Sequence, residues 1–261
     1  MSSNILTKKI IFSQIYNDIK TKIMTLKQIL TFTFVLFCFS MMAQTFSPAF
    51  GGFSRKKPTF ITMKDGTEIT VHIKNFKLKK GLVDELKVAP VSGKKKVKIN
   101  PEDISHMYVP PSALAKIAQT YDAIHDLSKI QDGELNSGHL DEGYLYMESS
   151  NVQVKKKKSQ YCMLQLMNPS FSKNIKVYND PYSKESVGVG VGGITVAGGL
   201  EKSYYIKKAG EDTARRIKKK EYKQDMDTLF GECPDLITKY GDSPEWSEFE
   251  KFIFDYSTMC N

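Results

Sequence analysis

A short apolar stretch near the N-terminus constrains this chain of 261 residues more than any other feature. Residues 29–39 are apolar apart from two threonines, Lys27 stands just before them, and small or apolar residues continue to Ala43. A positive flank, a short apolar core and a small terminal residue form the pattern of a signal peptide. We therefore expect residues 1–43 to be removed on export, which would make Gln44 the mature N-terminus.

Two alternatives to this interpretation stay open. Counted through to Ala43, the stretch spans 15 residues, fewer than the roughly 20 that a helix needs to cross a bilayer. A retained N-terminal membrane anchor at residues 26–43 is nevertheless the alternative to cleavage. Met24 stands where an initiator would precede a signal peptide, so it is an alternative start of translation.

The charge of the chain is mildly basic once the signal peptide is set aside. The formal net charge is +9, and residues 44–261 hold 33 basic against 28 acidic residues. Such an excess attracts anionic surfaces without naming a partner. We expect envelope proteins or anionic lipid head groups as partners. Because export would separate the chain from cytoplasmic nucleic acid, we expect no nucleic-acid partner.

The pattern of apolar residues and turn signals predicts an α+β fold in several parts. Residues 44–58 mix proline, glycine and serine and are typical of a linker. Short alternating segments at 59–110 predict a small β-barrel or sandwich-like unit. A helical spacing of apolar residues at 111–131 predicts a linking amphipathic helix. Residues 140–261 predict a second β-rich region that ends in a helical part.

A hairpin opens the first β unit. Asp65-Gly66 separates two alternating segments, and this dipeptide is a strong signal for a tight turn between strands. The alternation that follows predicts that Ile69, Val71 and Ile73 face inward, because successive side chains of a strand point to opposite faces.

The C-terminal part carries the clearest helical stripe. Trp246, Phe249, Ile253 and Tyr256 recur at helical spacing, after a serine, a proline and a glutamate that are typical of a helix start. We interpret these four side chains as core-facing and not as an aromatic binding cage. A shorter stripe precedes them and ends at Gly231, and a second short helix opens at Cys233-Pro234.

The mature chain contains three cysteines, Cys162, Cys233 and Cys260. Disulfides persist in exported proteins because the compartment is oxidising. Cys233 and Cys260 bracket the predicted helices, and a bridge between them would stabilise the fold by about 3–4 kcal/mol in the chain-entropy model. Two free buried thiols are the alternative. Cys162 lies in an apolar strand, which raises the pKa of a thiol and lowers its reactivity.

Two basic clusters are the candidate contacts for anionic surfaces, since clustered lysine and arginine attract phosphate groups. Their simpler interpretation is a solvated face, because neither cluster is interleaved with the aromatic residues that single-strand binders use. The candidate residues are Lys155, Lys156, Lys157, Lys158, Arg215, Arg216, Lys218, Lys219 and Lys220.

The sequence predicts no catalytic residue, no cofactor and no metal. Residues 188–193 formally match a dinucleotide-binding pattern, but β-branched residues follow where that motif needs a helix, so we expect a glycine-rich strand or loop. The four histidines have none of the spacings of metal-binding motifs.

Several segments together resemble a group of uncharacterised exported proteins of Bacteroidota-type bacteria. They are residues 41–44 (MMAQ), 61–67 (ITMKDGT), 101–104 (PEDI) and 229–234 (LFGECP), the last with a Cys-Pro step between C-terminal helices. The resemblance implies a compartment, and it carries no assigned activity.

The leading hypothesis is therefore a non-catalytic binding or structural module in the periplasm or at the cell surface. A periplasmic or secreted hydrolase, with a site assembled from distant residues, is the alternative from another class. A concave grouping of Asp, Glu or His would favour the hydrolase, and a flat aromatic or basic patch would favour the binding module.

Overall fold

The computed structural model describes residues 46–49, 51–79, 81–93, 95–112, 135, 137–155, 158–183, 189–191, 194–197, 201–241 and 244–260. The predicted signal peptide at 1–43 and nearly all of the predicted helix at 111–131 lie outside these residues. The alternative anchor at 26–43 lies outside them as well. Gln44–Asn261 forms one compact unit.

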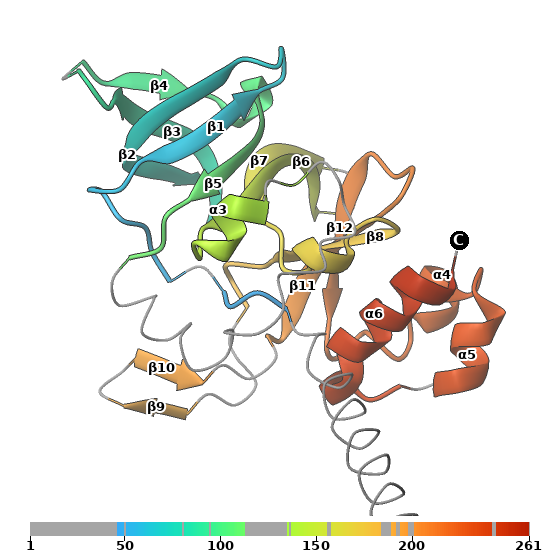
Figure 1. The fold of residues 1–261 in the computed structure, drawn as a ribbon. Helices are drawn as coiled ribbons and strands as arrows, with labels where there is room; N and C mark the ends of the chain where they lie inside the picture. The colour runs from blue at the N-terminus through green and yellow to red at the C-terminus, as the bar shows by residue number, and fades with distance from the viewer. Residues whose placement is uncertain are drawn as a thin grey trace, which may run out of the picture. The chain divides into compact units, whose positions relative to one another are not determined.

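Strands dominate this unit, and helices gather at its C-terminal end (Figure 1). The strands are β1 (Thr59–Met63), β2 (Glu68–Lys79), β3 (Leu82–Pro90), β4 (Val97–Ile99), β5 (Ile104–Val109), β6 (Leu145–Lys155), β7 (Lys158–Gln165), β8 (Ile175–Asn179), β9 (Val189–Val191), β10 (Ile194–Ala197), β11 (Ser203–Lys208) and β12 (Thr213–Lys218). The helices are α3 (Ser137–Asp141), α4 (Met226–Phe230), α5 (Pro234–Tyr240) and α6 (Phe249–Met259), with short 3-10 turns at Pro101–Asp103, Pro169–Phe171 and Trp246–Glu248.

Ten of the strands form one sheet, and part of that sheet closes on itself. Following the pairing from β3 through β2, β1, β5, β6 and β7 leads back to β3. The interior of this ring is filled by the inward side chains of its strands, among them Val71, Ile73 and Met107. We call this part of the sheet the β-ring.

The β-ring is irregular because β3 and β7 pair through one residue pair, Val83 with Met163. The other neighbouring strands of the β-ring pair over at least four residues each. The α+β class with C-terminal helices is confirmed, but the predicted small barrel is wrong in its extent. Residues 59–110 do not close a barrel by themselves, and β6 and β7 of the second region complete the β-ring.

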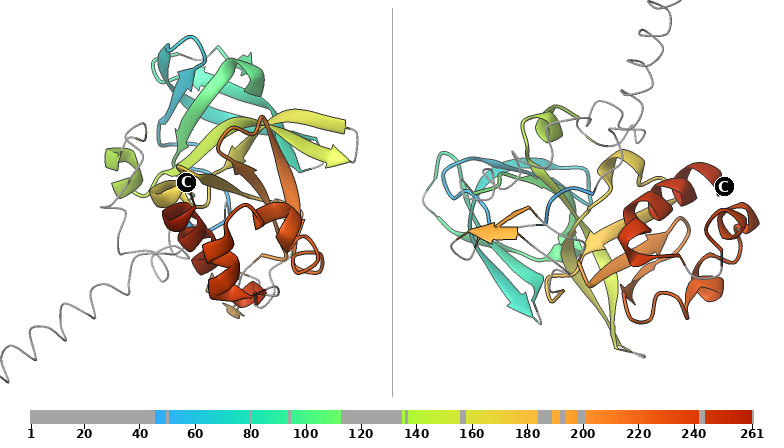
Figure 2. Two further views of the ribbon diagram at one scale, coloured as in Figure 1. Left: turned by 90° about the vertical axis from the view of Figure 1, so that its right-hand side faces the viewer. Right: turned by 90° about the horizontal axis from the view of Figure 1, so that it is seen from below.

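The long strand β6 joins the β-ring to the rest of the sheet. Its first half pairs with β5, and further along Asn151 and Val152 pair with β12 in parallel. Strands β12, β11 and β8 then continue the sheet. Helices α4, α5 and α6 lie against this second part, as both views in Figure 2 show.

The sequence predicts the helical end well. Trp246, Phe249, Ile253 and Tyr256 are all buried in the core shared with β8, β11 and β12, which confirms the core-facing stripe. The helix itself starts later than the turn signals indicate, because Trp246–Glu248 forms a 3-10 turn before α6. No helix within the described ranges is long and apolar enough to cross a membrane.

The segment predicted as a linker packs onto the fold instead. Phe46 is 8% exposed and lies in the same core as Phe249, and the Ser47 N–H donates to the Met167 carbonyl at 2.6 Å. Further along, Phe53 forms a bridge with Pro111. Phe46 and Phe53 therefore hold this segment against the fold, and the linker interpretation leaves both residues unexplained.

Glu250 on α6 gives a prediction for the effect of pH on stability. Its Oε2 accepts a hydrogen bond from the Phe46 N–H at 3.4 Å, and burial raises the pKa of Glu250 from its ordinary 4.5 to about 7. Folding therefore disfavours the ionised carboxylate, and this group costs stability as the pH rises from about 4.5 to about 7. Below that window, folded and unfolded chains both hold the proton, and the cost vanishes.

We expect Glu250→Gln to raise the free energy of unfolding by about 2 kcal/mol near pH 8 and to change it little near pH 4, since one pKa unit corresponds to about 1.4 kcal/mol and the group is only half-buried. Urea unfolding at both pH values measures the difference. Glu68→Gln, at an exposed carboxylate, is the matched control. An equal effect of Glu250→Gln at both pH values would contradict the prediction.

Candidate functional site

A half-open cavity of about 560 Å³ lies along the weakly paired seam between β3 and β7. Val83 and Met163, the residue pair that closes the β-ring, both line it. Because the two strands pair nowhere else, side chains and not backbone hydrogen bonds fill the space between them. Its walls come from the N-terminal segment, the β-ring strands and the loop after β8, and the lining residues are Gly51, Gly52, Phe53, Arg55, Asn75, Phe76, Leu78, Gly81, Leu82, Val83, Ser112, Met147, Met163, Leu164, Gln165, Asn179 and Pro181.

The segment at 51–55 forms one wall and is held by the end of the β5 region. The Ser112 N–H donates to the Gly52 carbonyl at 3.1 Å, and the Ser54 N–H donates to the Pro110 carbonyl at 2.8 Å. Gly52 has a φ of 131°, a conformation that residues with a Cβ rarely adopt. On the cavity side, the ring of Phe53 meets the ring of Phe76 edge-on with centroids 4.8 Å apart.

The tip of the β2–β3 hairpin forms the mouth of the cavity. β2 runs to Lys79, six residues beyond Ile73, the last residue of the expected alternation, so it places Phe76 and Leu78 at the cavity. The side chain of Leu78 is 58% exposed. Gly81, in the turn, has a φ of 67°, and a Cβ there would lie 2.8 Å from the ring of Tyr182. Glycine therefore allows that ring to lie over the turn.

Two polar side chains of the cavity wall keep an oxygen without a hydrogen-bond partner among the described residues. Gln165 is 2% exposed, and its Nε2 donates to the Pro48 carbonyl at 2.7 Å, while its Oε1 has no donor. The Oδ1 of Asn179 is likewise buried without a donor. Buried polar atoms are nearly always hydrogen-bonded. A bound molecule with a hydrogen-bond donor could therefore donate to one of these two oxygens.

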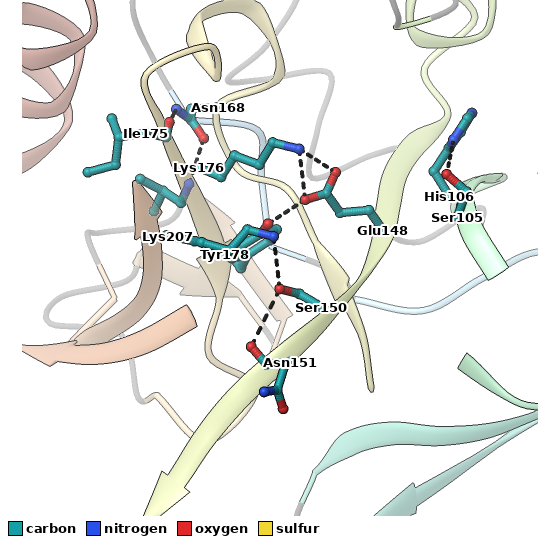
Figure 3. Close-up of polar contacts among 11 residues, drawn as sticks. Ser105, His106, Glu148, Ser150, Asn151, Asn168, Ile175, Lys176, Tyr178 and Lys207 are labelled. Atoms are coloured by element: carbon teal, nitrogen blue, oxygen red, sulfur yellow. Dashed lines mark hydrogen bonds and ion pairs between the residues drawn. The ribbon is translucent and has the colours of Figure 1, made fainter. Parts of the chain in front are cut away.

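A second polar cluster lies on the outer face of β6, where it meets β8 and β11 (Figure 3). Glu148 is 7% exposed, and Lys176 donates to its two oxygens at 3.1 and 2.9 Å. The Tyr178 hydroxyl also donates to Glu148. Burial, followed by the charge of Glu148, raises the pKa of Tyr178 well above its ordinary value. The hydroxyl therefore stays protonated and holds the carboxylate in place.

Lys207 extends this cluster, with its Nζ 3.2 Å from the Ser150 hydroxyl. Burial lowers the pKa of Lys207. In Figure 3 the Glu148 carboxylate points toward Lys176 and Tyr178 and away from His106. Glu148 is thus a charged residue whose partners all lie within the fold. Its contacts with Lys176 and Tyr178 join the β-ring to the second part of the sheet.

The structure separates the predicted basic residues into paired and exposed groups. Arg215 pairs with Glu211 at 2.7 Å, Arg216 with Asp180 at 2.5 Å, and Lys218 with Glu221 at 3.0 Å. Lys220 lies 3.8 Å from Glu221 and is mostly exposed. Exposed positions are also found for Lys155, Lys158 and Lys219, whereas Lys156 and Lys157 lie outside the described residues.

Lys158 and Arg215, which are distant in sequence, meet in an open groove that also contains Glu211 and Asp212. The parallel pairing of β12 with β6 brings them together. Both oxygens of Glu211 are engaged, one by Arg215 and the other by the Lys208 N–H at 3.0 Å. The groove therefore carries mixed charge, and its acid is held by its own neighbours.

The cysteines fall into two kinds. Cys233 and Cys260 form a disulfide with Cα atoms 5.6 Å apart, as predicted. Cys162 is a buried free thiol, and burial raises its pKa to about 12. It is therefore protonated and unreactive at neutral pH. Within the described part of the chain, no three His, Cys, Asp or Glu side chains converge as a metal site would require.

No local motif marks the cavity, so the amino-acid sequence does not predict it. Arg55 and Phe53 lie in the segment interpreted as a linker, and Leu78 lies beyond the expected strand end. One signal was present, since Phe76 and Leu78 resume an alternation that is shifted by one residue from that of Ile69, Val71 and Ile73, at the irregularity between Ile73 and Asn75. Nothing in the sequence of β3 or of β7 indicates that these two strands pair and close the β-ring.

Comparisons of the chain with protein-family models, with curated proteins and with solved structures found no match. The resemblance carried by residues 61–67 and 229–234 therefore stays a prediction. The chemistry of the cavity has to be inferred from the residues that line it.

Proposed function

We propose that the protein is an exported envelope protein that binds an apolar small molecule in the β-ring cavity and performs no chemistry on it. The observation that carries the proposal is the cavity itself. Its volume of about 560 Å³ falls within the roughly 300–1,000 Å³ typical of small-molecule sites. Its lining is mainly apolar, with a few polar groups, which is the usual composition of such sites.

The choice between a binding module and a hydrolase follows from the lining. None of the described residues around the cavity is Asp, Glu or His, and these side chains supply most acid–base catalysis. The acidic residues that do lie in a groove, Glu211 and Asp212, share it with Lys158 and Arg215. The cavity therefore supports binding better than it supports hydrolysis.

Export is the second part of the proposal. It is supported by the apolar stretch at 29–39 and by the disulfide between Cys233 and Cys260, a bond that persists in oxidising compartments. Cell fractionation with N-terminal sequencing of the native protein tests it. We expect Gln44 at the N-terminus of an envelope protein, whereas a cytoplasmic protein that keeps residues 1–43 would contradict export. The exposed lysines Lys155, Lys158 and Lys219 are then available to anionic lipid head groups.

A binding assay with Nile red, a neutral apolar fluorophore, tests the cavity. We expect one molecule to bind per chain and Leu78→Asp to weaken its binding about tenfold or more, because the substitution removes apolar surface and places a charge at the mouth. Val97→Asp is the matched control, since Val97 is 47% exposed on β4 and does not line the cavity. Loss of binding in both variants to the same extent, or no binding by the native chain, would contradict the proposal.

A further inference from the structure

The charge distribution around the cavity carries an inference that rests on the proposed function and goes one step beyond it. Of the seventeen described residues that line the cavity, Arg55 is the charged one. A wholly apolar molecule offers no charged or polar partner to a cation at the cavity wall. A cation at the edge of an apolar space instead matches a molecule with two ends, one apolar and one negatively charged.

Arg55 differs from the other arginines of the chain. Arg215 pairs with Glu211, and Arg216 pairs with Asp180. Arg55 is exposed, and the described residues offer it no ion-pair partner. Its guanidinium is therefore available to a carboxylate or phosphate, which it can hold through two parallel hydrogen bonds.

The position of Arg55 also fixes where such a group would lie. The segment at 51–55 is tied to residues 110–112 by backbone hydrogen bonds, so Arg55 has an anchored backbone. Two residues earlier, Phe53 packs against Phe76 in the wall. The wall also includes the buried apolar side chains of Leu82 and Met163. The lining thus combines one cation with aromatic rings and buried apolar side chains.

We infer that the cavity binds an anionic amphiphile, whose carboxylate or phosphate head contacts Arg55 and whose apolar chain lies against Phe53, Phe76 and the β3–β7 seam. The methionines at that seam suit a flexible chain, because their thioethers adapt to irregular shapes. The acidic groups that would repel such a head are missing from the described lining.

Three probes that share one alkyl chain and differ in their head group separate the contribution of the head group to binding from that of the alkyl chain. They are dodecanoate, dodecyl phosphate and dodecanol, measured by displacement of Nile red, with the two anions kept below their critical micelle concentrations and the alcohol below its solubility limit. We expect the native chain to bind both anions about tenfold more tightly than the alcohol, because a charge-assisted contact contributes more than a neutral one. Equal affinity for dodecanoate and dodecyl phosphate would identify the charge, and not one head group, as what is recognised. A preference for one of them would name the head group.

The variant Arg55→Gln should weaken the two anions about tenfold and leave dodecanol unchanged. Lys56→Gln is the matched control, because Lys56 is the exposed neighbour and does not line the cavity. Thermal unfolding of both variants checks that the exposed substitutions leave the fold intact.

The outcomes separate this inference from the proposal beneath it. Equal binding of dodecanol and dodecanoate, or equal losses from Arg55→Gln and Lys56→Gln, would overturn the head-group contact while the cavity remained a binding site. Failure of Nile red to bind the native chain would overturn both.

Discussion

Replacing Phe249 by alanine should lower the free energy of unfolding by about 3–5 kcal/mol, the range for truncating a buried phenylalanine. Phe249 is fully buried, and its ring centroid lies 4.6 Å from that of Trp246, 5.4 Å from Tyr204 and 5.5 Å from Tyr222. Phe46 contacts the same ring from the N-terminal segment at 6.0 Å. The substitution would open a cavity where α6, β11 and that segment meet. Urea denaturation followed by tryptophan fluorescence measures the loss.

Tyr222→Phe is the control for this core. The Tyr222 hydroxyl is buried without a hydrogen-bond partner among the described residues, so its removal should leave stability unchanged or raise it by about 1 kcal/mol. Tyr204→Phe should behave differently, because the Tyr204 hydroxyl accepts the Glu201 N–H at 3.1 Å. A loss of more than about 1 kcal/mol for Tyr222→Phe, or less than that for Phe249→Ala, would contradict the packing described.

Removing the disulfide should have the second large effect. The bridge between Cys233 and Cys260 closes a loop with a sequence separation of 27. Chain entropy predicts that its loss costs about 3–4 kcal/mol. Cys233 precedes α5 and Cys260 follows α6, so the bridge ties the start of α5 to the end of α6. The double variant Cys233→Ala with Cys260→Ala should therefore unfold at a clearly lower urea concentration.

Reductant provides the internal control for this experiment. It should lower the urea midpoint of the native chain to that of the double variant and leave the variant itself unchanged. Native chain without reductant should also resist alkylation at both cysteines. A midpoint that is insensitive both to reductant and to the double substitution would show that the bridge does not hold the helices.

The features that sequence predicts best are those encoded by neighbouring residues. The stripe from Trp246 to Tyr256 needs only the helical period to be recognised, and all four of its residues are buried. The hairpin at Asp65-Gly66 is equally local, and Val71 and Ile73 face inward as expected. The cysteine pair could be proposed because its two members bracket predicted helices.

The features that sequence could not supply depend on contacts between distant segments. The sequence of strand β12 was interpreted only as a basic cluster, because two adjacent arginines interrupt the alternation expected of a strand. In the structure these arginines pair with Glu211 and Asp180. The β-ring depends on Val83 meeting Met163 across 80 positions of sequence. The cavity arises from that same seam, so neither the fold of the β-ring nor its candidate site could be read from any one segment.

The central claim is that the seam between β3 and β7 holds an apolar ligand, and methionine methyl resonances test it most directly. Met147 and Met163 line the cavity, Met107 is buried in the β-ring, and Met226 is buried in the helical core. On titration with dodecanoate, we expect the Met147 and Met163 signals to shift in saturable fashion, while Met226 stays unchanged. Leu78→Asp should weaken this response. Shifts confined to Met226 or to the exposed Met259, or no saturable shift at all, would contradict the account.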